Sequence, residues 1–324
     1  MPDRRGSPLY DRRYEHDACG VGFVADAGGR SRDRVLPLAL AGLGSLGHRG
    51  AFAADGASSD GAGVLLPLEH SLLGTLAPGL GGRPGLISVF LPRRKAAAAA
   101  ARRIVNAALI EERLPAAAWR TVPSDPAALG READATRPAF TQAIVERPTG
   151  LSDARFELRL VLARRRMEAA ARNAGPTLAM FAVPSASCRS IVYKGLVAGG
   201  RLADLFPDLA AGAAVSHAIF HQRYATNTRP DWRLAQPFRA IAHNGEINTV
   251  RTNREQVRGR AVDPLGAAGS PARRLIEAGP LLSPDGSDSM SLDEALELLA
   301  VTGWNLETAL LALIPEAAAL RQSG

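Results

Sequence analysis

The sequence predicts an α+β fold in which β-sheets are covered by helices. Runs that alternate apolar and polar residues, the pattern of half-buried strands, gather in groups apart from runs with helical periodicity. The regular strand–helix alternation of a parallel α/β sheet does not extend through the chain, so layered sheets are expected instead. The 324 residues, 46% of them hydrophobic, are enough for one or two globular domains.

Separate elements can be placed in the first part of the chain. Residues 1–18 are charged and patternless and lack the apolar core of a secretory signal, so they are expected to be a leader or propeptide. Residues 19–68 predict a strand, a helix and a second strand. The run at 83–92 predicts a strand, the Ala- and Arg-rich residues 95–113 predict a helix, and the Pro-rich stretch 115–138 predicts turns.

Strand patterns continue through the middle of the chain, and helices follow them. Residues 140–147 and 154–165 alternate as half-buried strands do, although 163–173 could instead continue as a helix. Residues 178–187 and 189–196 are expected to form paired strands. The remaining predictions are a strand that runs into a loop at 213–226, a strand that ends in a turn at 239–248, and helices at 250–260 and 291–312, the last with Ser-x-x-Asp/Glu capping character.

The charge of the chain does not indicate nucleic-acid binding. The net charge is +7 and the isoelectric point about 10.2, but the basic residues are scattered arginines, with lysine only at Lys95 and Lys194. Aromatic residues make up 5% of the chain and do not alternate with basic residues as base-stacking platforms do. With no secretory signal and no apolar run of about 18 residues, the chain is expected to be cytoplasmic and to bind no membrane.

The cysteines and histidines do not predict a metal site. Cys19 and Cys188 are too few for a disulfide framework and lack the spacing of a zinc or iron–sulfur site, and Cys188 is expected to be buried and inert. His217 and His221 are four residues apart, but no acid lies between them as in metalloproteases, and no third ligand is evident. The Gly-x-Gly at 61–63 lacks the spacing of a dinucleotide-binding loop.

Cys19 is the candidate nucleophile. It precedes Gly20-x-Gly22 and an apolar strand, a setting in which glycine permits close backbone approach. If the chain were cut after Ala18, Cys19 would carry both its thiol and a free α-amine. Such an amine titrates at about pH 7.7–8 and can act as the base for the thiol, which alone is only a few per cent thiolate at pH 7. A cysteine beside glycines can also be simply a small buried residue.

Further motifs follow Cys19 in a fixed order. They are Asp60-Gly61-Ala62-Gly63, His221-Gln222-Arg223-Tyr224-Ala225-Thr226-Asn227-Thr228, Ala235-Gln236-Pro237-Phe238, Ala242-His243-Asn244-Gly245-Glu246-Ile247-Asn248 and Gly286-Ser287-Asp288-Ser289. This order resembles the class II glutamine amidotransferases, which are N-terminal-nucleophile hydrolases. SIVYKGL before the histidine block and HNGEINTVRTNR after it are most similar to the glutaminase domain of the glutamate synthase large chain. The resemblance extends from Tyr10 to about Pro315.

The resemblance implies a role for each matching residue. Cys19 would attack the amide, while the Asn244 side chain and the Gly245 backbone N–H would form the oxyanion hole that acyl transfer requires. Arg223 would bind the α-carboxylate of glutamine through its planar fork, and Asp288 would bind the α-ammonium. Asp288 could equally be an N-cap or first-turn acid, or serve both purposes. Thr226, Asn227 and Arg49 are also expected in the pocket.

The resemblance also implies a fold, a reaction and partners. The fold is the four-layer αββα sandwich of N-terminal-nucleophile hydrolases. The amidotransferase domain is expected at 19–324 and is C-terminally incomplete relative to the family. The reaction converts L-glutamine to glutamate and ammonia through a Cys19 thioester. An ammonia-accepting synthase domain or subunit is the expected partner, and FMN and an iron–sulfur cluster are expected only in that synthase part. After Asn253 the sequence reads Arg-Glu-Gln-Val, where glutamate synthases usually carry an aromatic residue.

Two other interpretations stay open on the sequence alone. The chain could be a non-catalytic regulatory or assembly subunit that keeps the fold and a glutamine pocket. It could also be an inactive fragment that retains the amidotransferase fold. Retention or removal of residues 1–18 distinguishes the first of these from the enzyme, because an intact leader leaves Cys19 without a free α-amine.

Overall fold

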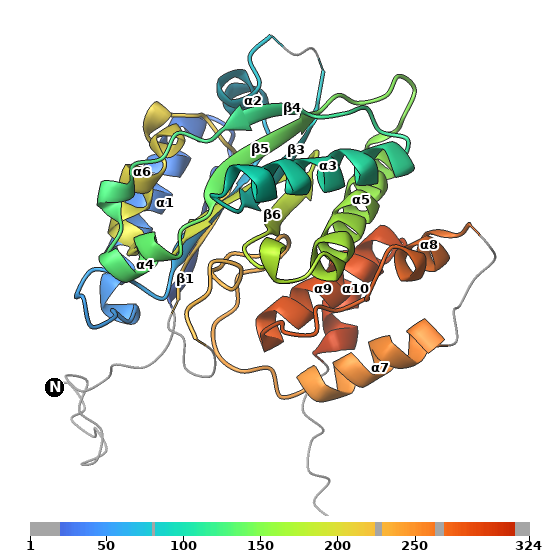
Figure 1. Cartoon of the computed structure of the whole chain (residues 1–324). Helices are drawn as coiled ribbons and strands as arrows, with labels where there is room; N and C mark the ends of the chain where they lie inside the picture. Colours follow the sequence, from blue (N-terminus) through green and yellow to red (C-terminus); the bar gives the residue numbers. More distant parts are fainter. Residues whose placement is uncertain (1–19, 80–81, 224–228, 263–268, 315–324) are drawn as a thin grey trace, which may run out of the picture.

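The computed structural model describes residues 20–79, 82–223, 229–262 and 269–314. These residues form an α+β fold, as predicted, and it contains two four-stranded antiparallel sheets (Figure 1). The first sheet has the strand order β1-β8-β2-β7, and the second has the order β4-β5-β3-β6. The strands are β1 (Gly20–Ala25), β2 (Ala62–Pro67), β3 (Gly85–Leu91), β4 (Ala118–Thr121), β5 (Ala139–Val145), β6 (Ala182–Ser187), β7 (Ser190–Gly195) and β8 (His217–Gln222).

Helices pack against both sheets and form a separate group after β8 (Figure 1). The α-helices are α1 (Arg32–Ser45), α2 (His70–Leu76), α3 (Lys95–Glu111), α4 (Arg131–Ala135), α5 (Asp153–Asn173), α6 (Leu202–Leu205), α7 (Val250–Val262), α8 (Pro271–Glu277), α9 (Asp288–Val301) and α10 (Leu306–Leu313). Short 3₁₀ turns are η2 (Leu46–Arg49), η3 (Pro126–Ala128), η4 (Pro176–Leu178), η5 (Gly199–Arg201) and η6 (Pro207–Ala211). Among the described residues, no helix has the length and apolar character needed to cross a bilayer.

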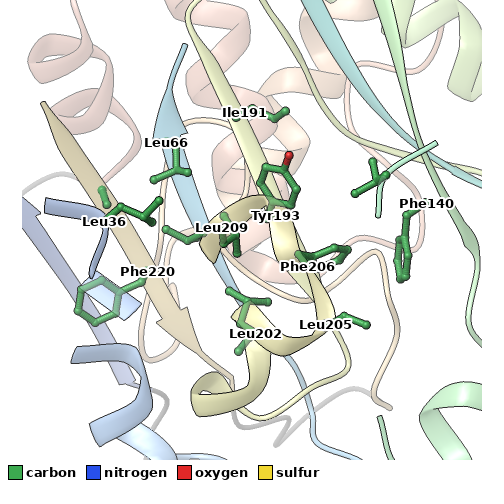
Figure 2. Packing of buried hydrophobic residues seen from close by; sticks show 14 of the residues in the cluster. Leu36, Leu66, Phe140, Ile191, Tyr193, Leu202, Leu205, Phe206, Leu209 and Phe220 are labelled. Atoms are coloured by element: carbon green, nitrogen blue, oxygen red, sulfur yellow. The ribbon is translucent and has the colours of Figure 1, made fainter. Parts of the chain in front are cut away.

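The first sheet packs on α1 through the ring of Phe220. A Cβ atom at Gly22 of β1 would lie 2.5 Å from this ring, and one at Gly42 of α1 would lie 2.9 Å from it. Both glycines therefore make space for one aromatic side chain. The apolar core continues from Tyr193 of the first sheet through Phe206 to Phe140 of the second sheet, with ring centroids 5.4 and 5.0 Å apart (Figure 2).

The strand predicted at 154–165 is wrong, because this segment belongs to the long helix α5. Ser152 caps the helix by accepting a hydrogen bond from the N–H of Arg155. Phe156 packs with α3 and the second sheet, whereas Val161 packs with α8 and the apolar residues beside it. A helix buried on two sides does not show a single apolar stripe, and local alternation in its sequence then imitates a strand.

Two other local predictions also need correction. The strands predicted at 178–187 and 189–196 exist as β6 and β7, but they do not pair with each other: β6 pairs with β3, and β7 pairs with β2. The turn between them takes the chain from one sheet to the other. The stretch 115–138, predicted as turns, contains β4 and the short helix α4 as well.

The helix predicted at 291–312 is two helices, α9 and α10. The break lies at Gly303, whose φ of +105° is a conformation that side chains disfavour. Asn305 then caps α10 by accepting a hydrogen bond from the N–H of Thr308. Likewise α9 begins at Asp288 rather than at Ser291, with Ser287 as its N-cap.

Candidate active site

Several segments that carry predicted site residues meet at one end of the first sheet. Gly20, the first residue of β1, lies opposite Gln222, the last residue of β8. Gly20, the residue that follows Cys19 in the sequence, and Arg223 therefore lie at the same end of two neighbouring strands. Cys19 itself, together with Thr226 and Asn227, lies outside the described residues.

Arg49 lies in the 3₁₀ turn η2, next to this end of the sheet. A Cβ atom at Gly20 would lie 2.8 Å from the side chain of Leu46, and one at Gly50 would lie 2.5 Å from Nε2 of Gln222. The turn is thus in close contact with the ends of β1 and β8. These contacts bring the turn that contains Arg49 to this end of the sheet.

Arg223 is buried at the end of β8, with 6% of its surface exposed. Its backbone N–H donates a hydrogen bond to the carbonyl oxygen of Gly61, with 2.8 Å between N and O. The side chain of Gln222 is fixed from several sides: its Oε1 accepts from the N–H of Gly199 at 2.7 Å, and its Nε2 donates to Ser59 at 3.2 Å. These bonds hold the residue before Arg223 in one orientation.

Val21, His221, Gly63 and Lys194 lie side by side across the four strands of the first sheet, and we call them the floor row. Facing residues of antiparallel strands point to the same side of a sheet, and the ring of Phe220 on the next row packs against α1. The floor row therefore faces away from α1. His221, Gly63 and Lys194 of this row contact backbone atoms of the segment 233–243.

The strand predicted at 239–248 is wrong, because these residues form no strand. Their backbone is bound by side chains instead of by a neighbouring strand. Oδ1 of the buried Asp293 accepts hydrogen bonds from the N–H groups of Ala240 at 2.7 Å and Ile241 at 3.3 Å. Oε1 of Gln236 accepts from the N–H of His243 at 2.9 Å. A strand-like sequence at this place thus becomes an irregular segment whose backbone is bound by side chains.

His243 is bound on both sides of its peptide group, directly before Asn244 and Gly245. Its carbonyl oxygen accepts hydrogen bonds from Nε2 of Gln236 at 3.1 Å and from Nε2 of His221 at 3.0 Å. Its ring Nδ1 lies 3.0 Å from Oγ of Ser289. Asn244 and Gly245 are exposed, and Gly245 has φ of +104°, so the turn projects from a fixed base toward solvent.

Asp288 is the first residue of α9 and is partly exposed. Its Oδ2 accepts a hydrogen bond from the N–H of Ile247 at 3.1 Å, and its Oδ1 accepts from the N–H of Ser289 at 2.6 Å. The N-cap is Ser287, so Asp288 is a first-turn acid and not the cap. The structure therefore brings Asp288, the Asn244–Gly245 turn and the Arg223 end of β8 together around His243.

Burial controls the protonation of the groups beneath the turn. Burial lowers the pKa of His221 to about 4, against the opposing effect of its bond to the carbonyl of His243. His221 is therefore neutral at pH 7 and donates its Nε2 proton. Burial also lowers the pKa of Lys194 to about 7. Far from the site, burial and the adjacent Glu157 raise the pKa of Cys188 to about 12, which fits the predicted inert thiol.

Several supporting residues lie in the recognised motifs, but sequence analysis assigned them no role. Gln236 and His243 belong to blocks that flank Asn244, and Lys194 belongs to SIVYKGL. Their polar side chains inside apolar segments indicated buried polar contacts. The partners of these contacts are distant in sequence, so the local pattern could not identify them. Across the described ranges, no group of three or more His, Cys, Asp or Glu residues could hold a metal ion.

The family model for class-II glutamine amidotransferases matches residues 19–323. The chain belongs to this family. The match begins at Cys19 and includes the turn at Asn244 and the first turn of α9, so the geometry described above lies inside the amidotransferase domain.

Curated relatives of this amidotransferase domain are glutamate synthases. The large chain of the NADPH glutamate synthase of Azospirillum brasilense is 38% identical over 315 residues, which cover 95% of this chain and 20% of the relative. Ferredoxin-dependent glutamate synthase 2 of Synechocystis is 38% identical over 311 residues, with 94% and 20% covered. The NADH glutamate synthase of Saccharomyces cerevisiae is 34% identical over 338 residues, with 98% and 15% covered. The chain thus spans about a fifth or less of the length of these relatives.

Proposed function

We propose that this amidotransferase domain hydrolyses the side-chain amide of L-glutamine, with Cys19 as the nucleophile. The observation that carries the proposal is the position of the Asn244–Gly245 turn. His243, which precedes the turn, forms hydrogen bonds with His221 of β8 and Ser289 of α9. Ile247, which follows the turn, donates to Asp288. These bonds hold the turn between the end of β8 and the first turn of α9. β1 begins at this end of the sheet, one residue after Cys19.

The reaction proceeds in two acyl-transfer steps. The Cys19 thiol passes its proton to its own α-amine and attacks the amide carbon, and the resulting oxyanion accepts hydrogen bonds from the Asn244 amide and the Gly245 N–H. The α-ammonium returns a proton to the leaving nitrogen, and the C–N bond breaks to release ammonia. Water then attacks the glutamyl thioester, which frees glutamate and restores the thiol.

Charge and position support the proposed contacts with glutamine. Arg223 provides a guanidinium whose two-donor fork matches the α-carboxylate, and Asp288 provides a carboxylate for the α-ammonium. The two groups have opposite charge, as the α-carboxylate and α-ammonium of glutamine require, and a residue close to each of them in sequence contacts His243, namely His221 on β8 and Ser289 on α9. Thr226, Asn227 and Arg49 complete the proposed pocket.

We further propose that residues 1–18 are removed to expose Cys19, because the α-amine can act as a base only when it is free. The start of the family match at residue 19 supports this boundary. The four-layer αββα sandwich is also part of the proposal, supported by the two antiparallel sheets and the helices packed on each of them.

The relatives are named glutamate synthases, and these names support a proposal for how the ammonia is used. We infer that it passes to a synthase domain or subunit for glutamate synthesis, and that FMN and an iron–sulfur cluster belong to that synthase part. In this proposal the amidotransferase domain supplies the ammonia.

The decisive experiment combines intact mass with ammonia release from glutamine. Protein from the full gene is compared with a variant that lacks residues 2–18, in which Met1 directly precedes Cys19 and can be removed by methionine aminopeptidase. Active protein should begin at Cys19 in both samples. Activity from chains that still begin at Met1 would contradict the N-terminal-nucleophile mechanism. A Cys19-initiated chain that binds glutamine and releases no ammonia would favour the non-catalytic subunit.

Cys188 provides an internal control for the identity of the nucleophile. A glutamine-like chloroketone should alkylate Cys19 and spare Cys188, whose high pKa and burial keep it a thiol. Cys19→Ser should abolish hydrolysis and leave glutamine binding nearly unchanged, whereas Cys188→Ser should keep the rate. Equal labelling of the two cysteines would argue against a directed pocket.

A further inference from the structure

Lys194 is a buried charged residue that the proposed glutamine chemistry does not use. It lies on β7, at one end of the floor row, and only 3% of its surface is exposed. Burying an ammonium is costly, and five of the six residues of β7 are buried. A lysine at such a place requires specific partners.

The partners of Lys194 are backbone carbonyl groups of one segment. Nζ donates hydrogen bonds to the carbonyl oxygens of Arg233 at 2.9 Å and Ala235 at 2.7 Å, and it lies 4.8 Å from the ring centroid of Phe238. The two carbonyls need two donors. An ammonium and a neutral amine both supply them, so the contacts persist in either protonation state.

The glycines of the Asp60-Gly61-Ala62-Gly63 block provide the surface on which this segment rests. A Cβ atom at Gly63 would lie 2.6 Å from the carbonyl oxygen of Gln236, and one at Gly61 would lie 2.8 Å from Cβ of Ala235. Side chains at these positions would push the segment off the sheet. The Gly-x-Gly therefore has a structural purpose here, close approach of a second backbone.

A continuous set of contacts leads from residues 233–236 to the Asn244–Gly245 turn. Lys194 fixes Ala235, the next residue Gln236 forms two hydrogen bonds with the backbone of His243, and Asn244 follows directly. His221, two strands away on the floor row, bonds the same carbonyl of His243. The base of the turn thus depends on the position of residues 233–236.

We propose that Lys194 is a positioning residue for the oxyanion turn: it holds residues 233–236 on Gly61 and Gly63, so that Gln236 keeps Asn244 and Gly245 in the orientation that the tetrahedral intermediate requires. This inference rests on the proposed function, because it assigns the turn its catalytic purpose. Lys194 touches no substrate in this scheme.

The test compares Lys194→Met with Lys95→Met. Methionine has the length and volume of the lysine stem but no donor, and Lys95, the other lysine, is exposed at the start of α3. The active sites are counted by the amount of Cys19 that reacts with the chloroketone, and kcat is calculated per active site. Lys194→Met should lower this kcat about 10- to 100-fold and keep KM within about threefold of the wild-type value, because misplaced oxyanion donors affect the transition state most. Lys95→Met should match the wild type. If the wild-type protein is active and Lys194→Met has the same kcat, the proposal is overturned.

Gly63→Ala provides a second variant that leaves the lysine intact. Its methyl group should displace Gln236 and reproduce the loss of kcat, whereas Gly74→Ala, on α2 with open space around it, should not. If Lys194→Met does not fold, this pair decides the question. A Gly63→Ala protein with normal kcat would overturn the proposal as well.

Amide hydrogen exchange separates this inference from the proposed function. In Lys194→Met, peptides that cover residues 236–248 should exchange at least about tenfold faster, while peptides from α3 keep their protection. Unchanged exchange at 236–248 contradicts the positioning role whatever the activity. Faster exchange together with a wild-type chain that releases no ammonia would mean that the support of the turn is right and that the glutaminase assignment is wrong.

Discussion

Asp288 accepts a hydrogen bond at Oδ2 from the backbone N–H of Ile247, with 3.1 Å between the two atoms. One carboxylate in the first turn of α9 therefore fixes the segment that leaves the Asn244–Gly245 turn. The same carboxylate is the proposed partner of the α-ammonium of glutamine. Its substitution will affect both support and binding, and two variants are needed to separate these effects.

Asp288→Asn should weaken glutamine binding with little effect on catalysis. The amide keeps one oxygen that can accept from Ile247; its NH₂ group cannot accept from Ser289, and it has no charge for the α-ammonium. Loss of a charge-assisted hydrogen bond, about 1.5–3 kcal/mol, corresponds to a rise in KM of about tenfold or more. Asp288→Ala should raise KM similarly and also lower kcat, because the contact with Ile247 is lost. Initial rates of ammonia release over a range of glutamine concentrations measure both constants. Equal KM in the wild type and both variants would remove Asp288 from the pocket.

Asn244→Ala should lower kcat by about 10²–10³ with a small effect on KM, because the oxyanion exists only in the transition state. Asn248, an exposed residue of the same segment, provides the matched control, and Asn248→Ala should keep both constants. A normal kcat in Asn244→Ala would show that the oxyanion hole lies elsewhere.

Arg223→Lys should have the opposite signature. Lysine keeps the positive charge but loses the planar two-donor fork, so KM for glutamine should rise by about tenfold while kcat changes little. The same rate measurements on this variant and on Asn244→Ala therefore separate ground-state binding from transition-state stabilisation. An unchanged KM would contradict the carboxylate-binding role of Arg223.

The stability of the fold should decrease in mild acid because of His221. Its pKa is about 4 in the folded chain, below the ordinary value of 6.5, so the unfolded chain binds the proton more readily. The contribution is fully present above pH 6.5 and is lost as the pH falls toward 4, by about 3 kcal/mol in total. Urea unfolding of the wild type and His221→Gln between pH 4.5 and 7.5 measures it. The difference between the two proteins should narrow as the pH falls, and a constant difference would be evidence against a neutral buried imidazole.

Lys194 should titrate near neutral pH. Burial is the main cause of its low pKa, the neighbouring Arg239 lowers it further, and Asp293 opposes this effect. Asp231 also opposes it, whereas Arg223 lowers the pKa. Because the chain has two lysines, protein labelled with ¹³C at lysine Cε should give two signals, and Lys194→Met should remove one of them.

The Lys194 signal should move with a midpoint near pH 7. The unfolded state then binds more protons than the folded state between pH 7 and about 10.5, so this lysine should make the free energy of unfolding rise with pH over that interval. Lys194→Met should reduce the rise. A midpoint above pH 10 for the Lys194 signal would contradict the desolvated environment.

The sequence alone determined the positions of elements whose local residue pattern is clear. β1, β2, β3 and β5 follow clear strand patterns, and α3 follows a clear helical one, so their positions were predicted correctly. α5 was not, because it is buried against the second sheet on one side and against α8 on the other. Its local pattern contains no information about the second neighbour.

The motifs around Cys19, Arg223, Asn244 and Asp288 were also recognisable from sequence, since residue type and order carry the chemistry of amide hydrolysis. Only the tertiary structure decided what holds them. Residues 239–243 have a strand-like sequence, but Asp293 and Gln236 bind their backbone, and Lys194 fixes the segment before them. These hydrogen bonds join side chains to backbone groups about 7 to 53 residues away, as the separation of each pair shows. Such contacts depend on strand register and on the approach of separate elements, which local residue patterns do not encode.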